Sequence, residues 1–306
     1  MALFEADFLS KLQRLALVAR GGGLPAAPAG DLRGGGVEPI GHRDYSPGDD
    51  YRRIDWRICA RHDELRTRLF QGEAERHVYL LLDCSASMGL GRPKKLDAAR
   101  QAAAALAYAS LDGLDCVSVL AFADRLLGGF GPLRDKSRFF QLAGWLKALS
   151  PQDRATDLKE TAAAFVARGS QRGPAVVLSD FYDPAGFRRG LDVLRRAGYR
   201  PAVVRIFDPA EAEPSMLGDW ELEDVESGLL WQATLTERHL ERYRRAFEEH
   251  AESLRRYGRT YGVRWAEVAC DLPTEEVLLR AVGARREGSR DSPATPLSRL
   301  RERGRG

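Results

Sequence analysis

The sequence predicts an α/β fold in which a doubly wound, mostly parallel sheet carries helices on both faces. Short apolar runs such as residues 78–82 have the near-continuous hydrophobicity of strands that are buried on both sides. Longer segments with helical patterning alternate with these runs, and this alternation is typical of parallel sheets. The expected strands are 78–83, 115–123, 174–180, 200–207 and 262–268, with a short edge strand near 126–130. The expected helices between them are 94–112, 135–149, 157–168, 184–197 and 274–283.

The first 36 residues combine a helix with a linker. Residues 4–20 are expected to form an amphipathic helix, because large apolar residues recur there at helical spacing: Phe4, Phe8, Leu12, Leu15 and Val18. Glycine, proline and alanine dominate residues 21–36, and such a composition ends a helix and forms a loop or linker.

Residues 37–76 are expected to form a small β-rich segment. The string Ser-Pro-Gly-Asp-Asp at 46–50 has turn chemistry, and residues 65–70 alternate apolar and polar side chains as a strand does. Two interpretations of the charged residues stay open, a structural ion-pair network and a surface for a partner protein. The candidate partner-binding residues are Asp49, Asp50, Arg52, Arg53, Asp55 and Trp56.

The regular alternation stops after residue 207. Residues 220–225 and 229–234 flank Glu-Ser-Gly, which predicts a β-hairpin with a short turn. A long amphipathic helix is expected over 236–257. From residue 285 the chain is rich in arginine, serine, proline and glycine with few apolar residues, so 285–306 is expected to be a disordered tail.

Composition excludes several classes of protein. The 306 residues carry a formal net charge of +3, too small to indicate nucleic-acid binding by itself. The four cysteines, Cys59, Cys84, Cys116 and Cys270, form no CxxC pair, so buried free thiols in a reducing compartment are expected rather than a zinc site. No run reaches the roughly 18 apolar residues of a membrane span, and the first residues lack the pattern of a signal peptide. A cytoplasmic protein is expected.

Polar side chains gather where the expected strands end. Asp83, Ser85 and Ser87 follow the strand at 78–83, Asp180 ends the strand at 174–180, and Thr156 precedes a helix. Ligands of open α/β sheets bind at the carboxyl ends of the strands. Two carboxylates and three hydroxyls at that edge offer the oxygen ligands that a hard divalent cation takes. Each residue also has a local alternative, since Asp83 and Asp180 can close turns and Thr156 can cap a helix.

This set of five residues resembles the metal-ion-dependent adhesion site of von Willebrand factor A domains. The shared pattern is Asp-x-Ser-x-Ser at 83–87, a distant threonine at Thr156, and an aspartate after a later strand at Asp180. The resemblance implies a von Willebrand A-type sheet and a Mg²⁺ ion, with Mn²⁺ and Ca²⁺ as alternatives. It also implies that the hydroxyls bind the ion and that the aspartates act through water. In many such domains glycine follows the last aspartate, whereas this chain has Phe181.

The flanking segments resemble domain-of-unknown-function 58 proteins. The residues that carry this resemblance are Tyr-Ser-Pro-Gly-Asp-Asp-Tyr-Arg-Arg-Ile-Asp-Trp at 45–56, Ala60-Arg61, and Glu73-x-Glu75 before the Asp-x-Ser-x-Ser strand. The resemblance covers residues 25–285. The expected organisation of the whole chain is 1–36 (helix and linker), 37–76 (β-rich), 77–284 (von Willebrand A-like domain) and 285–306 (disordered tail). The resemblance to the family also implies partnership with a MoxR-type AAA+ ATPase. Many members carry N-terminal membrane helices, which this sequence lacks.

The expected function is therefore non-enzymatic, with no catalytic residues. Neutral hydroxyls leave most of the positive charge of a bound cation uncompensated. The cation can therefore bind a carboxylate of the ATPase or of its client protein. The first alternative is a metal-dependent hydrolase that uses the same five residues, although the sequence shows no general base for it. The second is nucleic-acid association through the arginine-rich tail and residues 52–68. The sequence contains neither a GxxxxGK[ST] loop nor a complete dinucleotide-binding turn.

Overall fold

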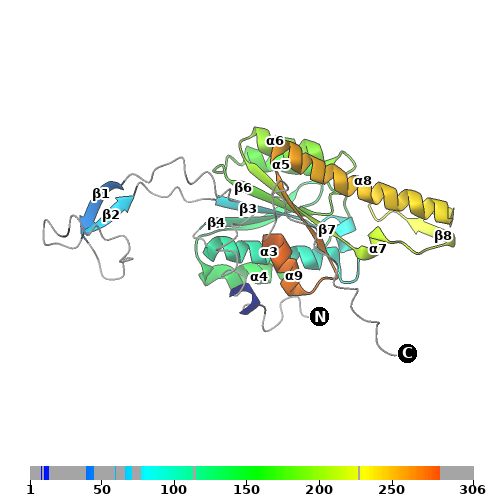
Figure 1. Cartoon of the computed structure of the whole chain (residues 1–306), viewed down its shortest axis with the longest axis horizontal. Coiled ribbons are helices and arrows are strands. Elements are labelled where there is room, and N and C mark those ends of the chain that lie inside the picture. The colour runs from blue at the N-terminus through cyan, green and yellow to red at the C-terminus, as the bar shows by residue number, and fades with distance from the viewer. Residues whose placement is uncertain are drawn as a thin grey trace, which may run out of the picture.

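The computed structural model describes residues 8, 10–13, 39–44, 59, 66–70, 77–112, 115–226 and 228–282. A mixed α/β domain with a six-stranded, mostly parallel sheet forms its centre (Figure 1). The strands are β3 (His77–Asp83), β4 (Cys116–Phe122), β5 (Leu126–Leu133), β6 (Pro174–Ser179), β7 (Arg200–Phe207) and β10 (Arg264–Ala269). Their order is β10-β7-β6-β3-β4-β5, and only the pairing of β4 with β5 is antiparallel. The expected α/β architecture and its edge strand are confirmed.

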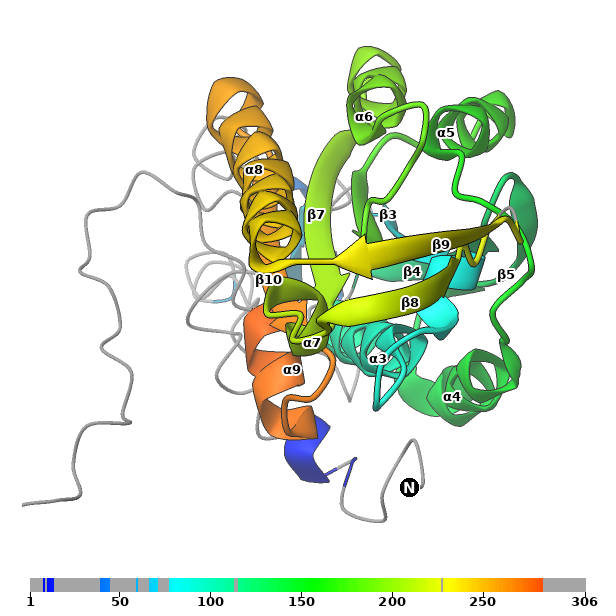
Figure 2. The ribbon, with the colours of Figure 1, turned by 90° about the vertical axis from the view of Figure 1, so that its right-hand side faces the viewer.

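Helices cover both faces of this sheet (Figure 2). Residues such as Leu80, Val119 and Val204 point to one face and pack in a core cluster with α3 (Lys95–Asp112), α4 (Phe139–Ala148) and α9 (Thr274–Val282). Their strand neighbours, such as Leu81 and Val203, point to the other face and pack with α5 (Leu158–Ala167), α6 (Phe187–Arg196) and α8 (Glu237–Tyr261). This alternation follows from the two-residue period of a strand whose both sides are apolar.

The strand order places β3 at the centre, between β4 and β6. The chain leaves β3 for α3 on one face and leaves β6 for α6 on the other face. Neighbouring parallel strands whose connections diverge in this way form a topological switch point at their carboxyl ends, where open α/β sheets bind ligands. We refer to the end at which β3, β4, β6 and β7 terminate as the carboxyl edge.

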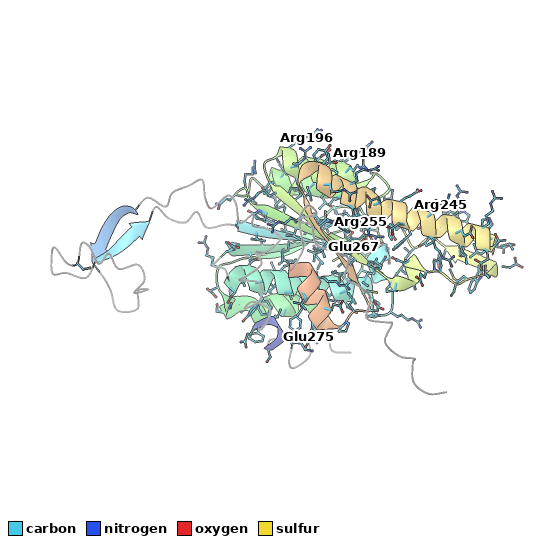
Figure 3. All side chains as sticks on the ribbon, in the orientation of Figure 1. Arg189, Arg196, Arg245, Arg255, Glu267 and Glu275 are labelled. Carbon is cyan, nitrogen blue, oxygen red and sulfur yellow. The ribbon has the colours of Figure 1, made fainter. Side chains whose placement is uncertain are left out.

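An ion-pair network fixes α8 against the edge of the sheet. Arg255 of α8 donates to Glu267 of β10 at 3.1 Å, and both residues are labelled side by side in Figure 3. Glu267 also accepts from Arg205 of β7 at 2.9 Å, and Arg205 is only 2% exposed. Because Glu267 joins two cations, it links the helix to two neighbouring strands.

Shorter strands and helices lie outside the central sheet and its main helices. The strands β1 (Pro39–Asp44) and β2 (Arg66–Phe70) pair antiparallel within the segment expected to be β-rich. The helix α7 (Pro209–Ala212) precedes the hairpin of β8 (Gly218–Glu223) and β9 (Leu230–Leu235). The one-turn helix η3 (Ala86–Gly89) follows β3, and a second one-turn helix, η4 (Lys136–Arg138), precedes α4. From the expected first helix, Phe8 and Leu12 are buried in the same cluster as α9.

Element boundaries differ from the expected ones where turn residues intervene. The helix α6 begins at Phe187 rather than at 184, because Gly186 has a φ of 87° and the Asp183 carboxylate closes the preceding turn. The helix α8 continues past Gly258 and ends at Gly262, whose φ of 65° is the left-handed conformation of a helix cap. Cys84, Cys116 and Cys270 are buried free thiols, as expected.

Candidate functional site

The first part of the site is the loop that follows β3. The backbone N–H of Ser85 donates to Asp83 Oδ1 at 2.8 Å, which closes a tight turn after the strand. The hydroxyl oxygens of Ser85 and Ser87 lie 3.1 Å apart, within hydrogen-bond distance, so both side chains point to the same place in the loop. Asp83, Ser85 and Ser87 are at most 5% exposed. The apolar strand thus ends in a buried cluster of oxygen atoms.

Backbone hydrogen bonds bring Thr156 to this loop. The N–H of Ala86 donates to Arg154 O at 3.0 Å, and the N–H of Gln152 donates to Cys84 O at 2.7 Å. These bonds align the segment before α5 with the loop after β3, and Thr156 Oγ1 then donates to Asp83 Oδ2 at 3.2 Å. Thr156 does not cap α5, because the Asp157 side chain accepts from the Glu160 N–H at the N-cap.

The end of β6 supplies the third part of the site. Ser179 Oγ donates to Asp83 Oδ2 at 2.5 Å, so this oxygen accepts from residues of two different segments. Asp180 Oδ1 accepts from the Tyr182 N–H at 3.2 Å, which closes a local turn. Phe181 has a φ of 63°, the left-handed conformation that glycine adopts easily. At Phe181 the loop therefore has a backbone conformation that glycine usually adopts. The Phe181 side chain is buried beside Phe187.

A buried lysine pairs with the same aspartate. Lys95 Nζ lies 2.7 Å from Asp180 Oδ2 and 2.6 Å from Glu211 Oε1 of α7. The Lys95 side chain has no exposed surface, and its ammonium lies 5.1 Å from the centre of the Tyr182 ring. Burial lowers the pKa of Lys95, but the charges of Asp180 and Glu211 outweigh this effect and raise it above its usual value. The charged side chain of Lys95 therefore links Asp180 of the site to Glu211 of α7 through two ion pairs.

Asp83 has a different electrostatic environment. Its carboxylate accepts from the hydroxyls of Thr156 and Ser179 and from a backbone N–H, all of which are neutral donors. Burial and the neighbouring charge of Asp180 raise the pKa of Asp83 to about 7. The negative charge of Asp83 is thus incompletely balanced, and a cation beside it would lower the free energy of the ionised form.

The structure brings all five predicted ligand residues, Asp83, Ser85, Ser87, Thr156 and Asp180, to the carboxyl edge. The predicted partner-binding residues Asp49, Asp50, Arg52, Arg53, Asp55 and Trp56 lie outside the described residues. Three further contributors were not predicted, namely Ser179, Lys95 and Glu211. The position of Ser179 at the end of a strand, beside Asp180, could have indicated that it belongs to the site. No sequence pattern indicated that Lys95 and Glu211 would pair there, because that ion pair depends on tertiary packing.

The donor set suits a hard cation. Carboxylate and hydroxyl oxygens are the ligands of Mg²⁺, which also keeps several waters and needs few protein ligands. Within the described residues, no three His, Cys, Asp or Glu side chains are grouped so that they could hold a metal ion. An ion at this site would consequently depend on the hydroxyls of Ser85, Ser87 and Thr156. The residues present fit Mg²⁺ on these terms.

Comparisons with known proteins place the chain in a family. Uncharacterized proteins of Mycobacterium bovis and Mycobacterium tuberculosis are 29% identical to it over 266 residues, which cover 85% of this chain and 83% of theirs. Among solved structures, a conserved hypothetical protein BatB from Bacteroides thetaiotaomicron has 17% identity, a TM-score of 0.40, and coverage of 68% of this chain and 97% of its own. In the described part of the chain, no helix has the length and apolar character to cross a membrane. The profile of the family described as "Protein of unknown function DUF58" matches residues 41–257, and the chain belongs to this family.

Proposed function

We propose that this protein is a non-enzymatic interaction protein that docks a carboxylate of a partner through a bound divalent cation. The domain at 77–284 would be of the von Willebrand A type, and Ser85, Ser87 and Thr156 would hold Mg²⁺ directly. Asp83 and Asp180 would act through water molecules. The partner would be a MoxR-type AAA+ ATPase or a client of that ATPase.

One observation carries the proposal. Side chains from two other segments converge on Asp83 at the switch point of the sheet, with Thr156 Oγ1 at 3.2 Å and Ser179 Oγ at 2.5 Å from Asp83 Oδ2. The Ser85 and Ser87 hydroxyls lie against each other in the same buried loop. A helix cap or a simple turn would explain one of these residues, but it would not explain why they meet.

The chemistry of such a site favours binding. Neutral hydroxyls leave most of the charge of a divalent ion uncompensated, so the ion can attract a carboxylate from another protein. Lys95 contributes to the same effect, because it already neutralises part of the charge of Asp180. The bound ion would supply an electrophilic position, and the protein residues would hold it at the end of a rigid strand.

The partner class is proposed from the resemblance of the Pro-Gly-Asp-Asp segment at 47–50, which implies genes encoded beside MoxR-type ATPases. Support for the resemblance comes from the family profile, which matches residues 41–257. The role of the segment with Asp49, Asp50, Arg52, Arg53, Asp55 and Trp56 stays a prediction, as does nucleic-acid association through 285–306.

The experiment is a binding titration against the MoxR-type ATPase of the same organism. We expect the affinity to fall at least about tenfold when EDTA replaces Mg²⁺ and when Asp83 is changed to Asn. Asp153→Asn is the matched control, because Asp153 is exposed in the loop that precedes Thr156. Undiminished binding under both treatments would contradict the metal bridge. Turnover of a phosphate ester that requires Mg²⁺ and Asp180 would indicate the hydrolase instead.

A further inference from the structure

The hairpin of β8 and β9 crosses the carboxyl edge on its solvent side. Figure 2 shows the two strands in front of the ends of β3 and β4. The hairpin is a separate two-stranded sheet, and its turn is closed by its own hydrogen bonds. Asp224 N donates to Leu229 O at 2.9 Å, and Gly228 N donates to Asp224 O at 2.7 Å. These two hydrogen bonds join Asp224 to Gly228 and Leu229 at one end of the hairpin.

The turn carries a carboxylate that lacks a hydrogen-bond donor. Glu226 Oε1 is enclosed, yet it has no hydrogen-bond partner among the described residues. Burial, followed by the negative charges of Asp180, Asp224 and Asp183, raises the pKa of Glu226 to about 7, whereas Lys95 acts in the opposite direction. An enclosed carboxylate oxygen without a donor is destabilising, and neighbouring carboxylates increase the cost.

The charges around Glu226 are not balanced. Asp83, Asp180, Glu211 and Glu226 are carboxylates of this region, and Lys95 is the cation that pairs with two of them. A divalent ion with its bound waters would add both positive charge and hydrogen-bond donors. The Glu226 oxygen without a protein donor and the excess of carboxylates around it therefore both favour a hydrated divalent cation at this position.

We propose that Glu226 is an additional carboxylate of the cation site, held to the ion through a bound water molecule, and that the hairpin closes over the ion through this contact. This inference rests on the proposed function. Because no three His, Cys, Asp or Glu side chains of the described residues form an ion-holding group, Glu226 accepts a hydrogen bond from a water on the ion rather than binding it directly. A partner carboxylate that approaches from the solvent side then replaces Glu226.

The hairpin has the loose attachment that such a replacement requires. Trp220 and Trp231 stay 43% and 52% exposed, although both are large apolar side chains. They lie on the same face of the hairpin, since Trp220 is paired with Ala233 and Leu222 with Trp231. A segment that buries little apolar surface opens at low free-energy cost. The hairpin can therefore lift without unfolding the sheet.

The test uses the full chain and Mn²⁺ as the probe, with affinities measured by isothermal titration calorimetry. We expect Glu226→Gln, which keeps the shape and removes the charge, to weaken Mn²⁺ binding about 10- to 100-fold. Glu221→Gln is the control, because Glu221 lies exposed on the same hairpin. The Mn²⁺ affinity of this variant should equal that of the wild type. Hydrogen exchange at 224–229 should slow with Mg²⁺ in the wild type and in Glu221→Gln only.

The outcomes separate this inference from the proposed function. If Asp83→Asn abolishes Mn²⁺ binding while Glu226→Gln binds as tightly as the wild type, or more tightly, the hairpin ligand is wrong and the cation site stands. If the wild type binds no Mn²⁺ at millimolar concentration, both are wrong. Equal weakening by Glu226→Gln and Glu221→Gln would also overturn the inference, because it would indicate a general effect of hairpin charge.

Discussion

Lys95 Nζ lies 2.7 Å from Asp180 Oδ2, and neither side chain is more than 1% exposed. A second carboxylate, Glu211, lies 2.6 Å from the same ammonium and belongs to the helix that precedes the hairpin. One cation thus joins the end of β6 to the base of the segment that covers the site. The end of β6 and α7 are therefore linked through one buried ammonium.

Lys95→Met is expected to destabilise the protein by about 3–5 kcal/mol, because it leaves buried Asp180 and nearby Glu211 without their counter-charge. Urea unfolding followed by circular dichroism measures this effect. Mg²⁺ should raise the melting temperature of Lys95→Met more than that of the wild type, since the ion replaces part of the lost positive charge. Lys94→Met is the control, because Lys94 is exposed. Equal stability of the two variants would contradict a structural role for the ion pair.

Two threonines of one region should respond in opposite ways to replacement by valine. Thr156→Val removes a donor to the buried carboxylate of Asp83, and we expect a loss of about 1.5–3 kcal/mol in unfolding free energy together with weaker Mn²⁺ binding. Thr161→Val should be neutral or stabilising by about 1 kcal/mol, because Thr161 Oγ1 is buried without a hydrogen-bond partner among the described residues. Unfolding curves and Mn²⁺ titrations of both variants give the comparison. A loss of Mn²⁺ affinity in Thr161→Val would contradict the assigned site.

The sequence predicted the sheet because its strands are apolar on both faces. The runs 78–82 of β3 and 174–178 of β6 contain no charged or strongly polar residue, so their burial could be predicted without knowing the neighbouring elements. The sequence analysis did not predict α7, a helix of only four residues, although a proline and the capping box of Asp208 and Glu211 mark its start. It also ended α8 one turn early, because Gly258 resembled a helix stop and instead lets the backbone at Val263 approach closely.

The part of the site that lies at the ends of strands could be predicted from the sequence. Asp83 and Asp180 end or follow adjacent parallel strands, so any parallel sheet that contains both places them at one edge. Lys95 was not predictable, because it stands beside the exposed Lys94 in a string that resembles a solvated helix start. The backbone of Phe181 was not predictable either, because the left-handed conformation is rare for a residue with a side chain. Phe181 adopts it with its side chain buried among Phe187 and other core residues.

Two helix glycines provide a test of the packing beside the site. A β-carbon on Gly190 of α6 would lie 2.7 Å from the carbonyl carbon of Leu158, the first residue of α5, two positions after Thr156. Gly190→Ala should therefore cost about 1–3 kcal/mol, because the helices must separate. Gly144→Ala should stabilise the protein by about 0.5–1 kcal/mol, since Gly144 of α4 faces open space. Thermal melts of both variants suffice, and a stabilised Gly190→Ala would show that α5 and α6 are not packed as described.

A histidine on α8 predicts how stability depends on pH. His250 packs against the rings of Tyr182 at 5.3 Å and Phe187 at 6.1 Å, and its Nε2 is buried without a hydrogen-bond partner among the described residues. Burial, followed by the positive charge of Arg205, lowers the pKa of His250 below its usual value of 6.5, although Asp180 opposes this shift. The folded protein thus holds this imidazole neutral at pH values where the unfolded chain has already bound a proton.

Because the pKa is lower in the folded state, the contribution of His250 to stability is fully present above pH 6.5. It is lost as the pH falls from that value through the folded pKa. Urea unfolding at a series of pH values should show this loss in the wild type and a smaller loss in His250→Gln. His239→Gln is the control, since His239 is exposed in the first turn of the same helix and glutamine can keep its capping contact with Thr236. If His250→Gln retains the full acid-induced loss and His239→Gln does not, the pH dependence originates at the start of α8 and not at the buried imidazole.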